Sequence, residues 1–456
     1  MRGEKRVAGI SDMTKGSPTK LLLRFAAPAI VGNMVEQLYI LADRAIVGRY
    51  VGADAFSAVG AGGALIFLFM SLSIGTQTGI GILTAQYYGA GDREGVEGAI
   101  RNGAYVVLSE AAFMTVLAFL LTEPLLGLLG TPPALMEDAA VYMKVYLAGQ
   151  ISIAACFSTF QVLRALGNSR VPMLIVVFSS VCNIVLDLLF VVWFPMGVFG
   201  AALASTLSQT LAALLCLIYA FRALPYFKEA FRSLRPDCRM LGKTIRLSLP
   251  AGAQNLFVYG SGSALQWVVN SFGVTAVGAF TATSQTESLI RHVYLGIGSA
   301  VAAFTGQNVG AGNLERAREG AASAAKITLG VSAGLTAFFW IFGEAFMGLL
   351  VDDQEMVSLA AAGIRITGSF FLAMGAVQAL HHFLGGAGDT VYPMKNSAVE
   401  AVSRIGLALV LTGNSAAGVW GIWITGGLSW TLAAVLSFRR YVTGEWREKG
   451  LVERNG

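Results

Sequence analysis

Long apolar segments, separated by short polar connections, run along this chain from residue 21 to residue 436. A membrane-spanning helix needs about 20 mostly apolar residues, and twelve segments meet this need. They lie near residues 21–48, 56–82, 99–121, 138–162, 171–193, 199–221, 245–270, 275–304, 323–343, 360–384, 393–412 and 417–436. Their length predicts helices rather than the shorter alternating strands of a membrane barrel. We therefore expect an all-α integral membrane protein with twelve transmembrane helices.

The pattern of the first half recurs in the second half at a constant offset of 221 residues. TAQYYGAGDRE at residues 84–94 returns as TGQNVGAGNLE at residues 305–315. The same offset relates Gly52 to Gly273, Pro172 to Pro393 and Gly197 to Gly418. One offset over several blocks indicates two copies of one architecture, each with six predicted helices. Membrane proteins built this way are usually transporters.

The positions of lysine and arginine predict the orientation. These residues gather in the two tails and in alternate connections, whereas the connections near 123–137, 194–198, 343–358 and 413–417 contain none. Short cytoplasmic loops carry the positive charge in membrane proteins. We therefore expect a multi-pass protein of the cell (inner or plasma) membrane with both termini cytoplasmic. Both halves then face the same way, which is a parallel pseudo-twofold repeat.

These patterns predict five regions along the chain. They are an N-terminal cytoplasmic tail (1–20), a six-helix bundle (21–221), a cytoplasmic linker (222–244), a second six-helix bundle (245–438) and a C-terminal cytoplasmic tail (439–456). The linker is the one long, strongly basic internal connection.

Composition supports the membrane assignment and excludes several functions. The chain is 55% hydrophobic and only 13% charged, whereas soluble domains carry about 25% charged residues. The net charge of +5 is explained by the basic loops, and no nucleic-acid recognition motif accompanies it. The four cysteines have no metal-ligand spacing, and no Walker A, G-x-S-x-G or HExxH motif occurs. We expect neither an enzyme nor a bound cofactor.

Polar side chains within the first and fifth predicted helices are the strongest functional candidates, because charges in a membrane span are costly. Asn33, Glu36 and Asp43 fall on one face of the first helix, and Asn183 and Asp187 lie four residues apart on the fifth. A carboxyl group in such apolar surroundings that gains and loses a proton is what proton coupling requires. The alternatives are solvation of a helix end for the first set and a structural hydrogen bond for the second.

Two further sets of polar side chains, in the sixth and seventh predicted helices, each allow two interpretations. Ser205 and Thr206 in the sixth helix could complete the polar network around Asp187 or simply allow close helix packing. The seventh helix carries a neutral polar stripe that either lines a substrate path or bonds to other helices. Its members are Asn255, Tyr259, Ser263, Gln266 and Asn270. Glu400 and Arg404, four residues apart, are expected to form an ion pair within one helix.

The chain resembles the multidrug and toxic compound extrusion (MATE) family. The resemblance rests on NMVEQLYILADRAIVGRYVGADAFSAVG in the first two helices, on TAQYYGAGD with TGQNVGAGN, and on RALGNSRVPM with GGAGDTVYPM. It covers nearly the whole chain. It implies two six-helix bundles around a V-shaped cavity and export of drugs or toxins driven by inward flow of protons or sodium.

The resemblance also implies roles for single residues. Asp43 matches the first-helix acid of the proton-coupled, DinF-like branch, Asn183 and Asp187 match its fifth-helix pair, and Thr206 matches its sixth-helix hydroxyl. Carboxylate, amide and hydroxyl oxygens suit a hard cation, so the same four residues are candidates for a Na⁺ site. Another branch has acids in its seventh and tenth helices, but this chain has Val258 near the first of these positions and no carboxylate in the tenth. We expect coupling in the first half, with Glu36 assisting.

The function favoured by these patterns is a secondary multidrug antiporter that works by alternating access as a monomer. It would export amphipathic, often cationic, drug-like compounds in exchange for H⁺ or Na⁺, with Asn33 and the stripe of the seventh helix lining the substrate cavity. The main alternative is a lipid-linked saccharide flippase of related architecture. Such a cavity should be rich in arginine and lysine to hold pyrophosphate, whereas these spans offer mainly acids and neutral polar residues.

Overall fold

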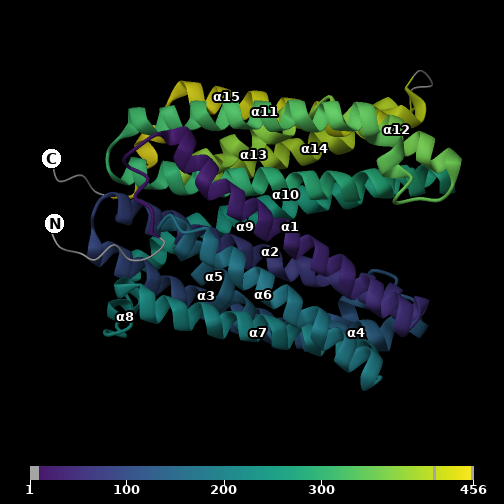
Figure 1. The fold of residues 1–456 in the computed structure, drawn as a ribbon, viewed down its shortest axis with the longest axis horizontal. Helices are drawn as coiled ribbons and strands as arrows, with labels where there is room; N and C mark the ends of the chain where they lie inside the picture. The colour runs from purple at the N-terminus through teal and green to yellow at the C-terminus, as the bar shows by residue number, and fades with distance from the viewer. Residues whose placement is uncertain (1–9, 414–416, 453–456) are drawn as a thin grey trace. The chain divides into compact units, whose positions relative to one another are not determined.

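A computed structural model describes residues 10–413 and 417–452 (Figure 1). The described residues are almost entirely helical and contain no strand. The α-helices are α1 Pro18–Tyr50, α2 Ala53–Gly89, α3 Arg93–Leu128, α4 Pro133–Ala148, α5 Gln150–Ala165, α6 Arg170–Asp187, α7 Gly197–Ala223, α8 Pro225–Ala230, α9 Cys238–Val269, α10 Val274–Gly310, α11 Leu314–Met347, α12 Gln354–Gly368, α13 Phe371–Gly386, α14 Val391–Gly413 and α15 Gly421–Thr443. The ends of both predicted tails and residues 414–416 lie outside the described residues. The predicted all-α fold is confirmed.

Each predicted span coincides with one helix or with a bent pair of helices. The pairs α4–α5 and α12–α13 each bend by 51°, and they replace the single spans predicted at 138–162 and 360–384. Within the described residues, seven helices are long and apolar enough to cross a membrane, or nine if each bent pair is one span. The remaining predicted spans are α9, α10 and α14, which are more polar because they carry the charged and amide side chains discussed below.

The repeat is visible in the backbone. Glycines with a positive φ angle recur at the 221-residue offset, as Gly52 and Gly273, Gly91 and Gly312, Gly167 and Gly388, and Gly197 and Gly418. Positive φ is strained for residues with a side chain. The matching glycines therefore give the two copies turns of the same backbone conformation at the same places. The bend between α4 and α5 at Gly149 corresponds in the same way to the break at Phe370 between α12 and α13.

The chain divides into two compact units. The N-terminal unit comprises Val31–Gly252 with the described residues before Met13, and the C-terminal unit comprises Met13–Ile30 with the described residues from Ala253 onward. Helices α1 and α9 therefore each contribute residues to both units. Within each unit the long helices run side by side (Figure 1).

Close packing explains why one segment of α1 and one segment of α9 belong to each unit. In the C-terminal unit, Leu22, Phe25 and Ala26 of α1 belong to the same buried cluster as Tyr294 and Phe304 of α10. In the N-terminal unit, α2 approaches the first part of α9 so closely that a Cβ atom at Gly75 would lie 2.3 Å from the backbone nitrogen of Gly252. Small residues permit such close approach of helices within a membrane.

Candidate functional site

The carboxyl groups of Asp43 and Asp187 lie against each other inside the N-terminal unit. Asp43 projects from α1 and Asp187 is the last residue of α6, where the chain passes into a π-helical turn, Leu188–Trp193. Asp43 is 5% exposed and Asp187 is fully buried. The two groups are close enough to share a hydrogen bond once one of them carries a proton. The structure thus brings together two acids that the sequence placed in separate helices.

The oxygen atoms of this pair have few other partners. Asp43 Oδ1 and both carboxylate oxygens of Asp187 are buried without a hydrogen bond among the described residues. Arg44, the neighbour of Asp43, is exposed and acts on Asp43 only through its charge. Two ionised carboxylates in contact repel each other, so they are satisfied together only by a shared proton or a bound cation.

Asn183 of α6 adds a further buried oxygen, one turn before Asp187. Its side-chain nitrogen donates to Ser205 Oγ at 3.3 Å. Its Oδ1 atom is buried and has no hydrogen-bond partner in the described part of the chain. Carboxylate and amide oxygens without other partners are the kind of donor that a hard cation prefers. No group of three or more His, Cys, Asp or Glu side chains that could hold a metal occurs in the residues described.

Thr206 lies in a different setting from the other proposed ligands. Its hydroxyl contacts the carbonyl oxygens of Ala202 at 2.9 Å and Val145 at 3.1 Å. Its methyl group fits against Gly149, where an added Cβ would lie 2.6 Å from Thr206 Cγ2. Thr206 therefore ties α7 to the bend between α4 and α5.

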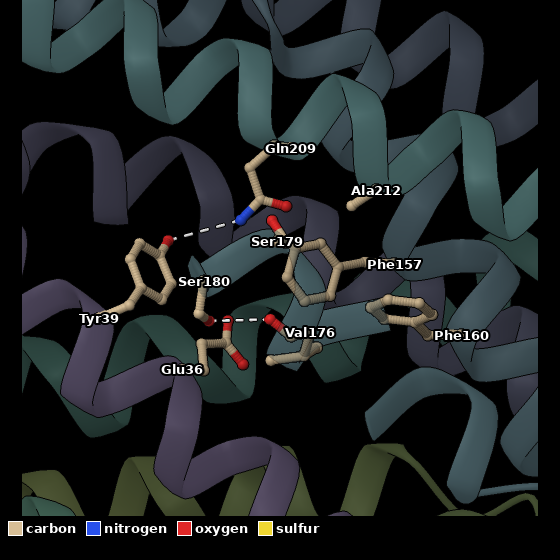
Figure 2. A pocket seen from close by; sticks show the side chains of 9 residues that line it. All are labelled: Glu36, Tyr39, Phe157, Phe160, Val176, Ser179, Ser180, Gln209 and Ala212. Carbon is tan, nitrogen blue, oxygen red and sulfur yellow. Dashed lines mark hydrogen bonds between the residues drawn. The ribbon is translucent and has the colours of Figure 1, made fainter. Parts of the chain in front are cut away.

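Glu36 lines a small pocket between α1, α5, α6 and α7 of the N-terminal unit (Figure 2). Glu36 and Tyr39 point from α1 toward Ser180 of α6 and Gln209 of α7, which donates to the Tyr39 hydroxyl at 3.5 Å. The free space, about 10 Å³, is roughly that needed for one water molecule. Asn33, one turn before Glu36, is also buried.

Tyr39 is a residue that the sequence analysis missed. It interacts electrostatically with both Glu36 and Asp43, and Tyr146 of α4 does the same. The signal was present, because Tyr39 is three residues after Glu36 and four before Asp43, on one face of α1. These side chains connect the pocket around Glu36 to the Asp43–Asp187 pair.

Glu110 of α3 is a second residue that the sequence analysis missed. Ser73 Oγ donates to Glu110 Oε1 at 2.7 Å and accepts from the side-chain nitrogen of Gln150 at 2.8 Å. Glu110 Oε2 and Gln150 Oε1 are buried without partners among the described residues. The sequence around Glu110 offers no second polar residue at helical spacing, so the tertiary structure alone reveals this group.

A larger cavity of about 290 Å³ lies within the C-terminal unit. Of the predicted stripe on α9, Tyr259 and Gln266 line it, whereas Asn255 and Ser263 are not among its lining residues. Glu287 and Arg291 of α10 also line the cavity. Further lining residues are His292, Arg404, Trp423 and Trp430. The predicted ion pair between Glu400 and Arg404 is confirmed, at 2.7 Å and with both side chains 6% exposed.

Comparison with known proteins agrees with the fold and the repeat. The family model MatE matches residues 28–189 and again residues 250–410. A probable multidrug resistance protein, YpnP, of Bacillus subtilis is 26% identical over 440 residues, which cover 96% of this chain and 97% of that protein. A protein named FAD transporter from Shewanella oneidensis is 24% identical over 78% of this chain and 80% of its own length.

A solved structure supports the same assignment at the level of the fold. A transporter of the MOP superfamily from Pyrococcus furiosus superposes with a TM-score of 0.91 and 24% identity, covering 96% of this chain and 99% of that one. Because the family model matches both halves, the twelve-helix architecture and the role of a small-molecule membrane transporter, not an enzyme, follow from membership. This chain belongs to the MatE family of transporters.

Proposed function

We propose that this transporter exports amphipathic, drug-like compounds, many of them cationic, in exchange for protons or sodium ions. The observation that carries the proposal is the contact between the Asp43 and Asp187 carboxyl groups, with three buried oxygen atoms that lack other partners among the described residues. The relatives named as multidrug resistance proteins support the substrate class.

The carboxyl pair supplies the coupling step. Without a bound ion, the two negative charges repel and favour an arrangement that admits water. A proton or Na⁺ entering from outside neutralises the pair and favours a closed, dry arrangement. A change of charge that favours one arrangement over another is what biases an alternating-access cycle.

Helix α1 is suited to pass this change on. It carries Asp43 in the N-terminal unit and contributes Met13–Ile30 to the C-terminal unit. Pro28 lies inside the helix next to the point where its residues change unit. Proline removes one backbone hydrogen bond and permits bending there. The proposed bundles at 21–221 and 245–438, with the linker at 222–244, are thus coupled by a shared helix.

The remaining predicted residues take supporting roles in this proposal. Asn183 supplies a further oxygen for Na⁺, and Thr206, which the sequence also suggested as a ligand, supports the site by tying α7 to the bend between α4 and α5. Glu36 passes protons toward Asp43 by way of Tyr39. For the substrate we propose Tyr259 and Gln266, which line the cavity of the C-terminal unit. Asn33, Asn255 and Ser263 stay sequence-based proposals for the same role. We propose that the protein works as a monomer in the cell membrane with both termini in the cytoplasm.

A lipid-linked saccharide flippase is the alternative. It would need an excess of positive charge to hold a pyrophosphate group. Two arginines, Arg291 and Arg404, line the cavity of the C-terminal unit, but Glu287 lines the same cavity and Glu400 pairs with Arg404. This balance of charge favours the antiporter.

The proposal is tested by ethidium efflux from a host that lacks its own drug pumps, at several pH and Na⁺ values. Asp43→Asn and Asp187→Asn should each lose most of the efflux, whereas Asp54→Asn, an exposed acid at the start of α2, should behave as the parent does. Full efflux by both pair variants would refute the site. Efflux that requires ATP but no ion gradient would refute antiport.

A further inference from the structure

The cavity of the C-terminal unit carries two opposite charges on one wall. Glu287 and Arg291 are one turn apart on α10, and both line the free space of about 290 Å³. That volume is in the range of sites for small organic ligands. Aromatic rings form much of the remaining wall, namely Trp423 and Trp430 of α15 together with Phe280 and Tyr259.

The neighbouring arginine is already fully engaged. Arg404 Nη2 donates to Glu400 at 2.7 Å, Nη1 donates to Ser261 Oγ at 3.2 Å, and Nε donates to Ser429 Oγ at 3.4 Å. Its guanidinium group also lies 5.9 Å from the ring centroid of Trp430. The Glu400–Arg404 pair is therefore neutral as a unit and holds α9, α14 and α15 together rather than waiting for a ligand.

Glu287 and Arg291 are different, because neither makes an ion pair in the described part of the chain. Glu287 lies close to Thr367, and the charges of Arg291 and Arg404 act on Glu287 at longer range. Arg291 makes no hydrogen bond to another described residue. The cavity thus offers one carboxyl group and one guanidinium group that have no direct ion-pair partner among the described residues.

We propose that this cavity binds an aromatic zwitterion. The ammonium group of the ligand pairs with Glu287, its carboxylate pairs with Arg291, and its ring packs against Trp423 and Trp430. A ligand with a single charge displaces the water and leaves either Glu287 or Arg291 buried without compensation, which is costly. A ligand with both charges satisfies the two side chains together.

This inference rests on the proposed function in one respect only, namely that the bound zwitterion is also transported. The binding itself is independent of any ion gradient. It also differs from the cationic substrates expected from the acids of the N-terminal unit, because Arg291 would repel a purely cationic ligand in this cavity.

The test is equilibrium binding to the purified full-length protein in lipid nanodiscs, by titration calorimetry with three probes that share an indole ring. Tryptophan carries both charges, tryptamine only the positive charge and indole-3-propionate only the negative charge. Tryptophan should bind about tenfold more tightly than either of the other probes, because each charged contact adds affinity.

Two variants assign the contacts. Arg291→Gln should weaken tryptophan and indole-3-propionate but not tryptamine, and Glu287→Gln should weaken tryptophan and tryptamine but not indole-3-propionate. Matched controls are Arg318→Gln, which changes a partly exposed side chain paired with Glu315, and Glu344→Gln, which changes an exposed one; both lie on α11 outside the cavity. They should bind all three probes as the parent does.

Three results would overturn the inference: no tryptophan binding, equal affinity for the three probes, or equal losses in the variants and the controls. Size-exclusion profiles of each variant separate a lost site from a misfolded protein. If binding fails while efflux still depends on Asp43 and Asp187, only this inference falls. If tryptophan binds as expected but efflux does not depend on Asp43 and Asp187, only the proposed coupling site is refuted.

Discussion

Asp43 of α1 and Asp187 of α6 place their carboxyl groups in contact, and no described side chain donates a hydrogen bond to Asp43 Oδ1 or to either oxygen of Asp187. If the proposed coupling site is right, this arrangement should make the N-terminal unit sensitive to a positive ion bound by the two acids. Its consequences can be measured in the stability of the folded protein as well as in transport.

The stability of the protein should depend on pH through this pair. At low pH a proton joins the two groups, whereas at high pH both ionise and repel, so stability should fall as pH rises. Asp187→Asn removes one charge and supplies an amide donor to Asp43, which should stabilise the protein at pH 9 by about 1–3 kcal/mol. At pH 5 the gain should be much smaller. Thermal unfolding at both pH values checks this, and Asp54→Asn should change neither midpoint.

Asn183 should contribute to cation binding through its buried Oδ1 atom. We expect Asn183→Ala to raise the Na⁺ concentration that gives half of the thermal stabilisation by about tenfold, since one oxygen ligand is lost. The measurement compares NaCl with choline chloride at constant ionic strength. Ser205→Ala removes the partner of the Asn183 nitrogen but no ligand atom, so it should keep the parent response. An identical Na⁺ response in Asn183→Ala would exclude this residue from the site.

The buried Glu400–Arg404 pair should be intolerant of losing one partner. Glu400→Gln leaves the Arg404 charge buried without its counter-ion and should destabilise the protein by about 3–5 kcal/mol. The double variant Glu400→Leu with Arg404→Met removes both charges and should recover much of that loss. Denaturation of the purified variants measures both effects. A double variant no more stable than Glu400→Gln would show that the loss does not come from the unpaired charge of Arg404.

Gly75 should be required for the contact between α2 and α9. A Cβ at this position meets the Gly252 backbone at 2.3 Å, so neither helix can yield locally. Gly75→Ala should therefore destabilise the protein by about 1–3 kcal/mol. Gly60 is the matched control, because it lies on the same helix and an added Cβ has no neighbour within 4 Å. Similar melting temperatures for the two variants would contradict the close packing.

Much of the architecture could be predicted because its signals are local. Apolar length predicted helices at all twelve positions, and the turn glycines, such as Gly52 with Gly273, predicted the repeat. The bends at Gly149 and Phe370 were missed, because an apolar run continues through each of them and hydropathy does not register a change of direction.

The candidate site was predictable only in part. Asp43, Asn183 and Asp187 stood out because polar groups in apolar helices are rare. Only the family resemblance grouped them into one site, because no periodicity along the chain relates α1 to α6. Tyr39 escaped notice since a tyrosine in a membrane helix is commonplace.

The sequence by itself therefore determined that this protein is a helical membrane protein built from two copies, because hydropathy and turn chemistry act over neighbouring residues. Only the tertiary structure showed which distant groups come together: Asp43 with Asp187, Ser73 with Glu110, and Glu287 and Arg291 in one cavity with the tryptophans of α15. It also decided that α1 and α9 each serve both units. These outcomes depend on how helix surfaces pack against one another, which no local pattern encodes.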